Sequence, residues 1–488
     1  MSARSRLAAV LPALALAFVT IRAARATLDD VDVGWLVAAG RWTLAAHAAP
    51  TRNAFSYAAP DHPWVMHEWL LGVIYAAGWR AVGAVFLNAI AVVAATALGG
   101  LVLHAARRTS ALAAAAWTTA LFVFSFNRLT SARPIGVMLV FPAIFVVLAF
   151  QRKLGSKRVI ALVVLELVWT NLHGSFLLGV VILLAAWWEG RTRAHLAALV
   201  GAAAATLVNP YGLGLHRLVL RYALGRDPTL TEVHARVLEF APVWRPSYHV
   251  LVSPLELGLL VFVAIAAVQR RHARGALALV LVAMALLQAR NVALATIVGS
   301  ILVFPPNVRD IVPRHPLRRP RRDASWLVLP AICAGLVALR APAIDGSLGG
   351  PGFARLVAEL PANANVFVPF RSSGLLLLLA GERGVRTFYD ARNDCYPDDL
   401  ARIGLALKDG ELPPEGLATI LRRFGTTAAI VPRADVVRAT PGDARWPALA
   451  VLEPALVTFA RVDEADGWRL LRATPSPREA PSASAPAP

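Results

Sequence analysis

The chain has 488 residues, of which 57% are hydrophobic and only 16% are charged. Soluble domains carry about 25% charged residues, so the composition excludes an ordinary water-soluble globule and indicates an integral membrane protein. The net charge of +19 comes largely from Lys and Arg clusters between apolar runs. Such clusters are typical of cytoplasmic loops and do not form the continuous basic face that a nucleic-acid partner requires.

Apolar runs along the chain predict about eleven transmembrane helices. Several runs are shorter than the roughly 20 residues that an isolated span needs, which is acceptable where neighbouring helices cover their ends. The runs lie near residues 7–26, 84–104, 111–127, 134–150, 159–172, 174–188, 194–208, 252–268, 275–289, 291–305 and 325–340.

Basic clusters predict the topology, with the N-terminus in the cytoplasm. Five loops then fall on the cytoplasmic side, and each carries two or more Arg or Lys: 105–110, 151–158, 189–193, 269–274 and 306–323. The same assignment places the remaining connections on the outer side: 27–83, 127–133, 172–174, 209–251, residue 290 and the tail from 341.

Two segments of the first outer loop predict helices that lie in the outer membrane interface. Segments 29–48 and 67–79 each carry apolar residues on one helix face, with Trp35, Trp42 and Trp69 as interfacial anchors.

Three regions follow from these patterns. Residues 1–340 are predicted to form the transmembrane domain, 341–473 an extracytoplasmic α/β domain, and 474–488 a disordered tail. Within the second region, the predicted strands are 366–370, 386–389, 428–431 and 457–462. The predicted helices are 374–381 and 414–424. The two cysteines, Cys333 and Cys395, are not expected to pair.

Polar side chains near the membrane gather on the predicted outer side. Carboxylates beside a bilayer are costly, and a cluster of them at Asp29, Asp30 and Asp32 indicates a site rather than a surface. The candidate site residues all fall at outer helix ends: Asp30, Asp32, Arg41, His67, Glu68, Arg128, Arg133, Asn171, His173 and Arg290.

Each candidate also has a structural interpretation. The acidic cluster could cap a helix whose dipole favours negative charge, and His67 with Glu68 could form a helix N-terminal turn. Arg128 and Arg133 could extend along the bilayer to its interface, or could form a bidentate phosphate clamp. Glu166 lies inside an apolar run, which indicates either a functional acid or a neutral, hydrogen-bonded one.

Together, these residue types suit the transfer of a sugar from a lipid phosphate. A carboxylate, Asp30 or Asp32, would take the proton from an acceptor hydroxyl. Cationic groups must neutralise the departing phosphate, and three arginines are predicted for this role: Arg128, Arg133 and Arg290.

The remaining acid of the cluster has a predicted role as well. Asp32 together with His67 and Glu68 could bind a hard divalent cation, Mg²⁺ or Mn²⁺, or these side chains could bind the sugar.

The order of motifs resembles that of bacterial GT-C-type polytopic membrane glycosyltransferases. This class includes protein O-mannosyltransferases, oligosaccharyltransferases and lipid A aminoarabinose transferases. The matching residues of the first outer loop are Asp30, Asp32, Trp35, Gly40, Arg41, Phe55, Ser56, Trp64, His67, Glu68, Trp69 and Leu70. Further matches are Arg133-Pro134, Asn171 to Gly174, Asn209 to Gly212, and Asp390, Arg392, Asp394 and Tyr396.

The resemblance implies an all-α polytopic membrane bundle of the GT-C type with two interfacial helices, followed by a small C-terminal α/β domain. It also implies that an acid of the first outer loop, Asp30 or Asp32, is catalytic. The donor would be a polyprenyl-phosphate-linked sugar in the bacterial inner membrane, and the acceptor an unknown glycan, lipid or protein. The sequence departs from the pattern at Leu36, Ile135 and Ser373-Gly374.

Two other functions remain open from the sequence. A transporter or flippase of a lipid-linked or anionic substrate would need ionisable groups deeper in the bundle, for which Glu166 is a candidate. A non-catalytic membrane scaffold would instead present the C-terminal domain to a partner in the cell envelope.

Overall fold

The protein is described from a computed structural model. The residues that the structure describes are 3–28, 30–106, 117–121, 123, 135–224, 232, 235–245, 252–270, 272–303, 325–344, 348–392, 394–409, 411, 414–433, 452, 456 and 459–473. Asp29, Arg128, Arg133, the tail 474–488 and most of the predicted span 111–127 lie outside these ranges.

Contacts between residues divide the chain into two compact units. Unit 1 comprises Met1–Leu28, Thr43–Ala49 and Val65–Ala343, and unit 2 comprises Asp29–Trp42, Pro50–Trp64 and Ile344–Pro488. The first outer loop therefore contributes to both units, and most of the helix that carries the acidic cluster belongs to unit 2.

Unit 1 is helical throughout its described secondary structure. Its α-helices are α1 (Ala3–Ala24), α3 (Trp69–Val82), α4 (Val85–Ala106), α7 (Ile135–Ala149), α8 (Ser156–Leu172), α9 (Leu177–Gly190), α10 (Arg193–Ala205), α11 (Leu213–Leu224), α13 (Pro254–Val268), α14 (Ala273–Leu287), α15 (Val292–Val303) and α16 (Ser325–Ala338). Short 3₁₀ turns η1 (Gly174–Phe176), η2 (Leu238–Phe240) and η4 (Ala289–Asn291) connect some of them. Ten of the predicted spans coincide with these helices, because long apolar runs leave the backbone little alternative to helix in an apolar environment.

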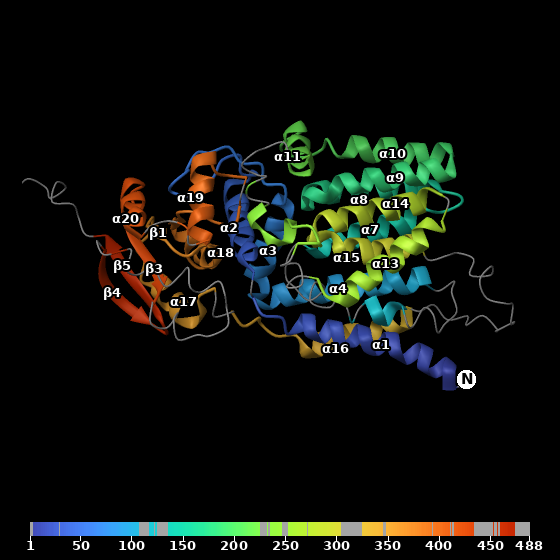
Figure 1. Ribbon diagram of the computed structural model, residues 1–488, viewed down its shortest axis with the longest axis horizontal. Coiled ribbons are helices and arrows are strands. Elements are labelled where there is room, and N and C mark those ends of the chain that lie inside the picture. Colours follow the sequence, from blue (N-terminus) through green and yellow to red (C-terminus); the bar gives the residue numbers. More distant parts are fainter. Residues whose placement is uncertain are drawn as a thin grey trace, which may run out of the picture. The chain divides into compact units, whose positions relative to one another are not determined.

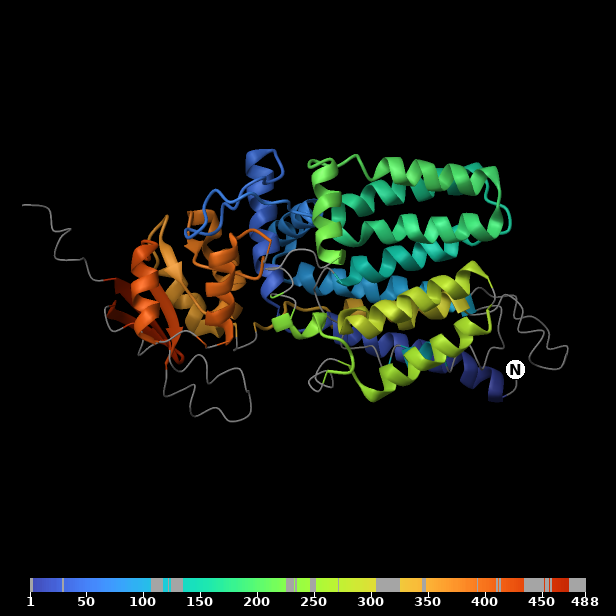
Figure 2. The ribbon, with the colours of Figure 1, turned by 45° about the horizontal axis from the view of Figure 1, so that its top comes forward.

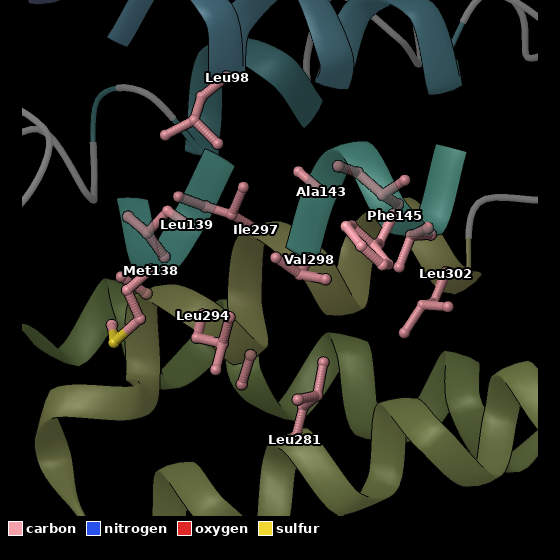
Figure 3. Packing of buried hydrophobic residues seen from close by; sticks show 14 of the residues in the cluster. Leu98, Met138, Leu139, Ala143, Phe145, Leu281, Leu294, Ile297, Val298 and Leu302 are labelled. Carbon is pink, nitrogen blue, oxygen red and sulfur yellow. The ribbon is translucent and has the colours of Figure 1, made fainter. Parts of the chain in front are cut away.

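The core of unit 1 forms around α15, in which every residue is buried. Its neighbours include α7, α13 and α14. Figure 3 shows side chains of α7 and α15 interleaved, with Leu281 of α14 and Leu98 of α4 beside them. Helices α8, α9 and α10 lie side by side at another part of the unit (Figures 1 and 2).

One described helix, at Val85–Ala105, is long and apolar enough by itself to cross a membrane. The other apolar helices in the described part of the chain have 10 to 17 residues. The count of about eleven spans therefore stays a prediction.

Unit 2 contains a mixed five-stranded sheet with the order β2-β1-β3-β5-β4 (Figure 1). Its strands are β1 (Asn365–Phe367), β2 (Arg386–Thr387), β3 (Ala428–Pro432), β4 (Phe459–Ala465) and β5 (Trp468–Ala473). Strand β1 pairs in parallel with β2 and β3, whereas β5 runs antiparallel to β3 and β4. The helices of this unit are α2 (Val31–Ala46, in its larger part), α17 (Gly350–Ala358), α18 (Phe370–Ala380), α19 (Asp398–Asp409) and α20 (Pro414–Arg423).

The predicted elements of this unit are partly correct. All four predicted strands overlap observed ones. The first was predicted to extend to Phe370, whereas β1 ends at Phe367 and Phe370 begins α18. Strand β5 and helices α17 and α19 were not predicted. The expectation that Trp35 anchors α2 in a membrane interface is wrong, because Trp35 is buried inside unit 2. It is 6% exposed and packs on Trp64.

Helix α2 lies against α18 through a contact of the two backbones. A Cβ atom added at Gly34 would meet the carbonyl oxygen of Gly374 at 2.0 Å, and one at Gly374 would meet the carbonyl oxygen of Val31 at the same distance. Only glycine permits so close an approach. Gly374, which lies in the departure at Ser373-Gly374, therefore permits this crossing together with Gly34.

A buried ion pair joins the first outer loop to the C-terminal part of unit 2. Arg392 donates from Nε to Oδ1 of Asp390 at 3.0 Å and from Nη2 to Oδ2 at 2.6 Å, and both side chains are almost fully buried. The same Nη2 donates to Oδ1 of Asn53 at 3.0 Å. The guanidinium also lies over the rings of Phe55 and Trp64. Two residues of the predicted tail motif thus organise the fold of the segment 50–64.

The variant Asp390→Ala tests this role. It leaves the Arg392 guanidinium buried without its carboxylate, and removing one partner of a buried pair costs about 3–5 kcal/mol. We expect amide hydrogen exchange in β3 to accelerate by about a hundredfold or more, if that strand exchanges through opening of the unit.

The matched control is Glu382→Ala, which breaks the ion pair of Arg41 with an exposed carboxylate at 3.3 Å. Exposed pairs contribute little, so exchange in β3 should stay as in the parent protein. Equal exchange rates in the two variants would contradict the role assigned to the buried pair.

Candidate functional site

A break after α8 places a polar cluster at the end of an apolar helix. Helix α8 ends at Leu172, and His173 adopts extended backbone angles before the turn η1 begins. The backbone N–H of His173 still donates to the carbonyl of Trp169, which closes the helix end. The motif Asn171 to Gly174, which lies between two predicted apolar runs, therefore ends one helix and begins the next.

Hydrogen bonds define the tautomer of His173. Its Nδ1 accepts the backbone N–H of Ser175 at 3.1 Å, so the ring proton of a neutral imidazole resides on Nε2. The hydroxyl of Ser175 also contacts Nδ1, at 2.8 Å. The Nε2 atom lies 3.3 Å from Oε1 of Glu68, toward which it can donate.

Glu68 lies between two histidines. The same Oε1 atom is 3.7 Å from Nε2 of His67, and the two imidazole rings are edge to face with centroids 6.5 Å apart. The Glu68 side chain is 8% exposed, so its charge depends on these donors for solvation. Three predicted site residues are therefore brought together in unit 1.

Arg290 adds positive charge to this cluster. Its guanidinium lies over the ring of Phe240 at 4.7 Å. Burial, together with the charge of Arg290, lowers the pKa of His67 from 6.5 to about 4 and that of His173 from 6.5 to about 3, and His67 also contributes to the lowered pKa of His173. Both imidazoles are therefore neutral at neutral pH, and the cluster combines one carboxylate, two neutral N–H donors and one permanent cation.

Asn171 ties this cluster to its surroundings. Its Oδ1 accepts the indole N–H of Trp69 at 2.9 Å, and its Nδ2 donates to the carbonyls of Leu167 and Val208. A pocket of about 460 Å³ opens beside it. Apart from Asn171, the only amide side chain among its lining residues is that of Asn209, and the others are mainly apolar. The lining residues are Trp69, Leu70, Leu167, Val168, Asn171, Leu207, Val208, Asn209 and Pro210.

The two described acids of the acidic cluster lie in unit 2 and have different environments. Asp30 is 6% exposed, and its Oδ1 accepts the backbone N–H of Asp32 at 2.7 Å. Because α2 begins at Val31, this is the hydrogen bond of a helix N-cap. Asp32 is only half-buried, and its Oδ1 accepts the indole N–H of Trp35 at 3.1 Å.

Arg41, also predicted as a substrate-binding residue, makes contacts within unit 2. It donates from Nη1 to the carbonyl of Leu378 at 2.8 Å and pairs with Glu382. These contacts hold α2 and α18 together. The roles predicted for Arg128 and Arg133 fall outside the described residues.

The His67–Glu68–His173 cluster does not suit a hard divalent cation. Magnesium prefers oxygen ligands, whereas both ring nitrogens of His173 are engaged, one as acceptor from Ser175 and the other facing Glu68. Within the described ranges, no three His, Cys, Asp or Glu side chains converge on a metal position. The predicted cation at Asp32, His67 and Glu68 stays a prediction.

Some functional contacts could not be recognised in the sequence. Ser175 sets the tautomer of His173, and its position two residues after a histidine in a helix break was the available indication. Phe240 supports Arg290 from a segment 50 residues earlier, for which no local pattern exists.

Comparison with known proteins supports the fold. No family model matches the chain. The oligosaccharyltransferase of Archaeoglobus fulgidus, crystallised with a tethered acceptor peptide containing the sequon NVT, aligns with a TM-score of 0.52 at 10% identity. The alignment covers 92% of this chain and 71% of that one. Its apo form aligns with a TM-score of 0.49 at 10% identity, over 93% and 73% of the two chains.

At this identity the likeness shows the fold alone, and it agrees with the predicted GT-C-type architecture at that level. A curated relative, the ribosomal RNA small subunit methyltransferase H of Geotalea daltonii, is 37% identical over 99 residues. The match covers 19% of this chain and about a third (32%) of that protein, which is too little to show a family.

The lowered pKa values of the two histidines predict how stability depends on pH. Between pH 6.5 and 4, these two histidines bind protons in the unfolded chain but remain neutral in the folded protein. The free energy of unfolding should therefore fall as the pH is lowered through this window. Each such proton contributes a slope of up to about 1.4 kcal/mol per pH unit.

The variant His173→Gln removes the more deeply buried of the two groups. Thermal unfolding in detergent, measured from pH 7 to pH 4, should show a shallower dependence than the parent protein. An identical slope would show that His173 takes up protons in the folded state as it does in the unfolded chain.

Proposed function

We propose that this protein is a membrane glycosyltransferase that moves a sugar from a polyprenyl-phosphate-linked donor to an acceptor at the outer face of the inner membrane. The observation that carries the proposal is the buried His67–Glu68–His173 cluster, with the charge of Arg290 acting on it, at the end of an apolar bundle. The likeness to an oligosaccharyltransferase fold supports it.

The outward faces of unit 1 support a membrane location. Large apolar side chains are exposed on several of its helices, for example Ile160, Val200 and Val261 at 62%, 59% and 58%. Soluble proteins rarely expose extended apolar surfaces. These faces suit contact with lipid.

Contacts at the two ends of unit 1 support the predicted topology. Arg274 pairs with Glu189 at 2.8 Å and lies over the ring of Phe150, so two predicted cytoplasmic loops meet at the end of the predicted span 134–150. At other helix ends, the bonds of Asn171 to Trp69 and Val208 join the predicted outer ends of the spans 159–172 and 194–208 to the first outer loop.

The chemistry assigned to these residues is a single displacement. An acceptor hydroxyl attacks the anomeric carbon, the bond from that carbon to the phosphate oxygen breaks, and polyprenyl phosphate leaves with the electron pair. Arg290 stabilises the charge on the departing phosphate. The apolar pocket beside Asn171 suits part of a lipid chain. One displacement inverts the configuration of the sugar.

The proton of the acceptor goes to a carboxylate, and we assign this role to Asp32. Asp30 already serves as the N-cap of α2, whereas Asp32 is partly accessible at the first turn of that helix. A general base contributes typically 10²- to 10⁴-fold to the rate.

Paired substitutions distinguish the two acids. Asparagine caps a helix about as well as aspartate, so Asp30→Asn should keep most of the transfer rate, whereas Asp32→Asn should lose about 10²- to 10⁴-fold. The measurement is transfer from a polyprenyl-phosphate sugar in proteoliposomes. Full activity of both variants would rule out this mechanism and would favour a scaffold.

A second candidate function, transport of a lipid-linked or anionic substrate, is favoured by Glu166. Its side chain is fully buried, and no hydrogen bond from the described residues reaches either carboxylate oxygen. A Cβ atom at Gly179 would lie 2.0 Å from its Oε2, so a glycine is what gives this side chain its space. An unpaired carboxylate would be very costly here, and the group is expected to be neutral.

Glu166→Gln separates the two functions. Glutamine imitates the neutral acid, so a transferase should keep its rate, whereas a transporter that moves a proton through Glu166 should lose flux. Flux in proteoliposomes without acceptor, abolished by Glu166→Gln, would favour transport over transfer.

A further inference from the structure

The carboxylate of Asp32 is the first member of a series of contacts inside unit 2. Its Oδ1 accepts the indole N–H of Trp35. The ring of Trp35 packs edge to face on Trp64, with centroids 6.1 Å apart and planes at 71°. Both indoles are buried, at 6% and 3% exposure. Trp64 therefore contributes to the orientation of Trp35, and the hydrogen bond to Asp32 depends on that orientation.

Arg392 in turn holds Trp64. Its guanidinium carbon lies 4.7 Å from the centroid of that ring and 5.0 Å from that of Phe55. The rings of Phe55 and Trp64 are themselves edge to face, at 88°. Cation–π contacts contribute about 0.5 to 2 kcal/mol or more, with the larger values where the groups are desolvated. The guanidinium is thus a desolvated cation beside two aromatic rings.

The hydrogen bonds of Arg392 fix the plane of this cation. Nε and Nη2 both bond to Asp390, which is the bidentate geometry that only a planar guanidinium provides. Nη1 is buried, and no acceptor among the described residues bonds to it. The aromatic contacts, rather than a complete set of hydrogen bonds, therefore account for the burial of this part of the side chain.

The helix that carries Asp32 has little other freedom. The backbone contact between Gly34 and Gly374 fixes the distance between α2 and α18. The contacts of Trp35 contribute to the direction of the Asp32 side chain at the first turn of α2.

We propose that Arg392 is a positioning residue that acts through Trp64 and Trp35 to orient the carboxylate of Asp32. The inference rests on the proposed function, in which Asp32 takes the proton of the acceptor. It assigns to the C-terminal part of the chain a share in catalysis that does not require this part to touch the substrate.

The variant Arg392→Lys tests the proposal. Lysine keeps the charge that Asp390 needs but lacks the planar fork that holds the rings. We expect kcat to fall by about tenfold or more, since a misplaced catalytic group is costly, while the KM for a polyprenyl-phosphate sugar donor stays unchanged. Full-length protein in proteoliposomes is used throughout.

A spectroscopic measurement separates positioning from general stability. In protein labelled with 5-fluorotryptophan, the ¹⁹F resonances of Trp35 and Trp64 are assigned by the variants Trp35→Phe and Trp64→Phe. Both resonances should shift in Arg392→Lys. The matched control is Arg383→Lys, which disturbs guanidinium bonds to the carbonyls of Val357 and Leu360 in the same unit, and it should shift neither.

The outcomes are distinct. Loss of kcat without a shift at Trp35 would overturn the proposal, as would a shift at Trp35 with normal kcat. If Arg392→Lys does not fold, Trp64→Phe provides the same test, because it alters the edge contact with Trp35 and should lower kcat in the same way. Parent protein that transfers no sugar would overturn the proposed function itself, whereas an active parent with an unaffected Arg392→Lys variant overturns this inference alone.

Discussion

The buried pair of Asp390 and Arg392 is the interaction on which the arrangement of unit 2 depends. Two charges removed from water must satisfy each other, and here the carboxylate takes both bonds of the guanidinium fork. That fixed cation then collects Asn53, Phe55 and Trp64 from the first outer loop. Together with the glycine contact between α2 and α18, it explains why the acidic helix belongs to the unit that contains the sheet. The position of the proposed base is therefore decided by residues from the opposite end of the chain.

In unit 1, charged groups are buried at the end of an apolar bundle. Glu68 is buried, and its charge is offset by the N–H group of His173 and by His67 close by. The histidines stay neutral because burial and the charge of Arg290 both oppose their protonation. A site of this kind can offer one permanent cation to an anionic group without collecting excess charge. A lipid phosphate is a ligand that matches these properties.

The sequence predicted the helices of unit 1 well, because an apolar run of sufficient length has one stable backbone conformation in an apolar environment. It also predicted that His67, Glu68 and His173 lie at the same side of the bundle, and the structure brings them into contact. It could not predict β5, in which Arg469 and Arg472 interrupt the apolar pattern and only pairing with β3 and β4 defines the strand. Nor could it assign different roles to Asp30 and Asp32, since the N-cap depends on where α2 begins. Trp35 was mistaken for an interface anchor because its partner Trp64 lies in a separate segment with no local pattern in common.

The central claim is that this chain breaks the bond between a sugar and a polyprenyl phosphate. The most direct measurement incubates the purified protein in proteoliposomes with a panel of polyprenyl-phosphate sugars and candidate acceptors, and follows free polyprenyl phosphate by mass spectrometry. The account predicts release of polyprenyl phosphate that depends on an acceptor, together with a glycosylated product of inverted anomeric configuration. Intact donor that crosses the bilayer without release of polyprenyl phosphate would contradict it.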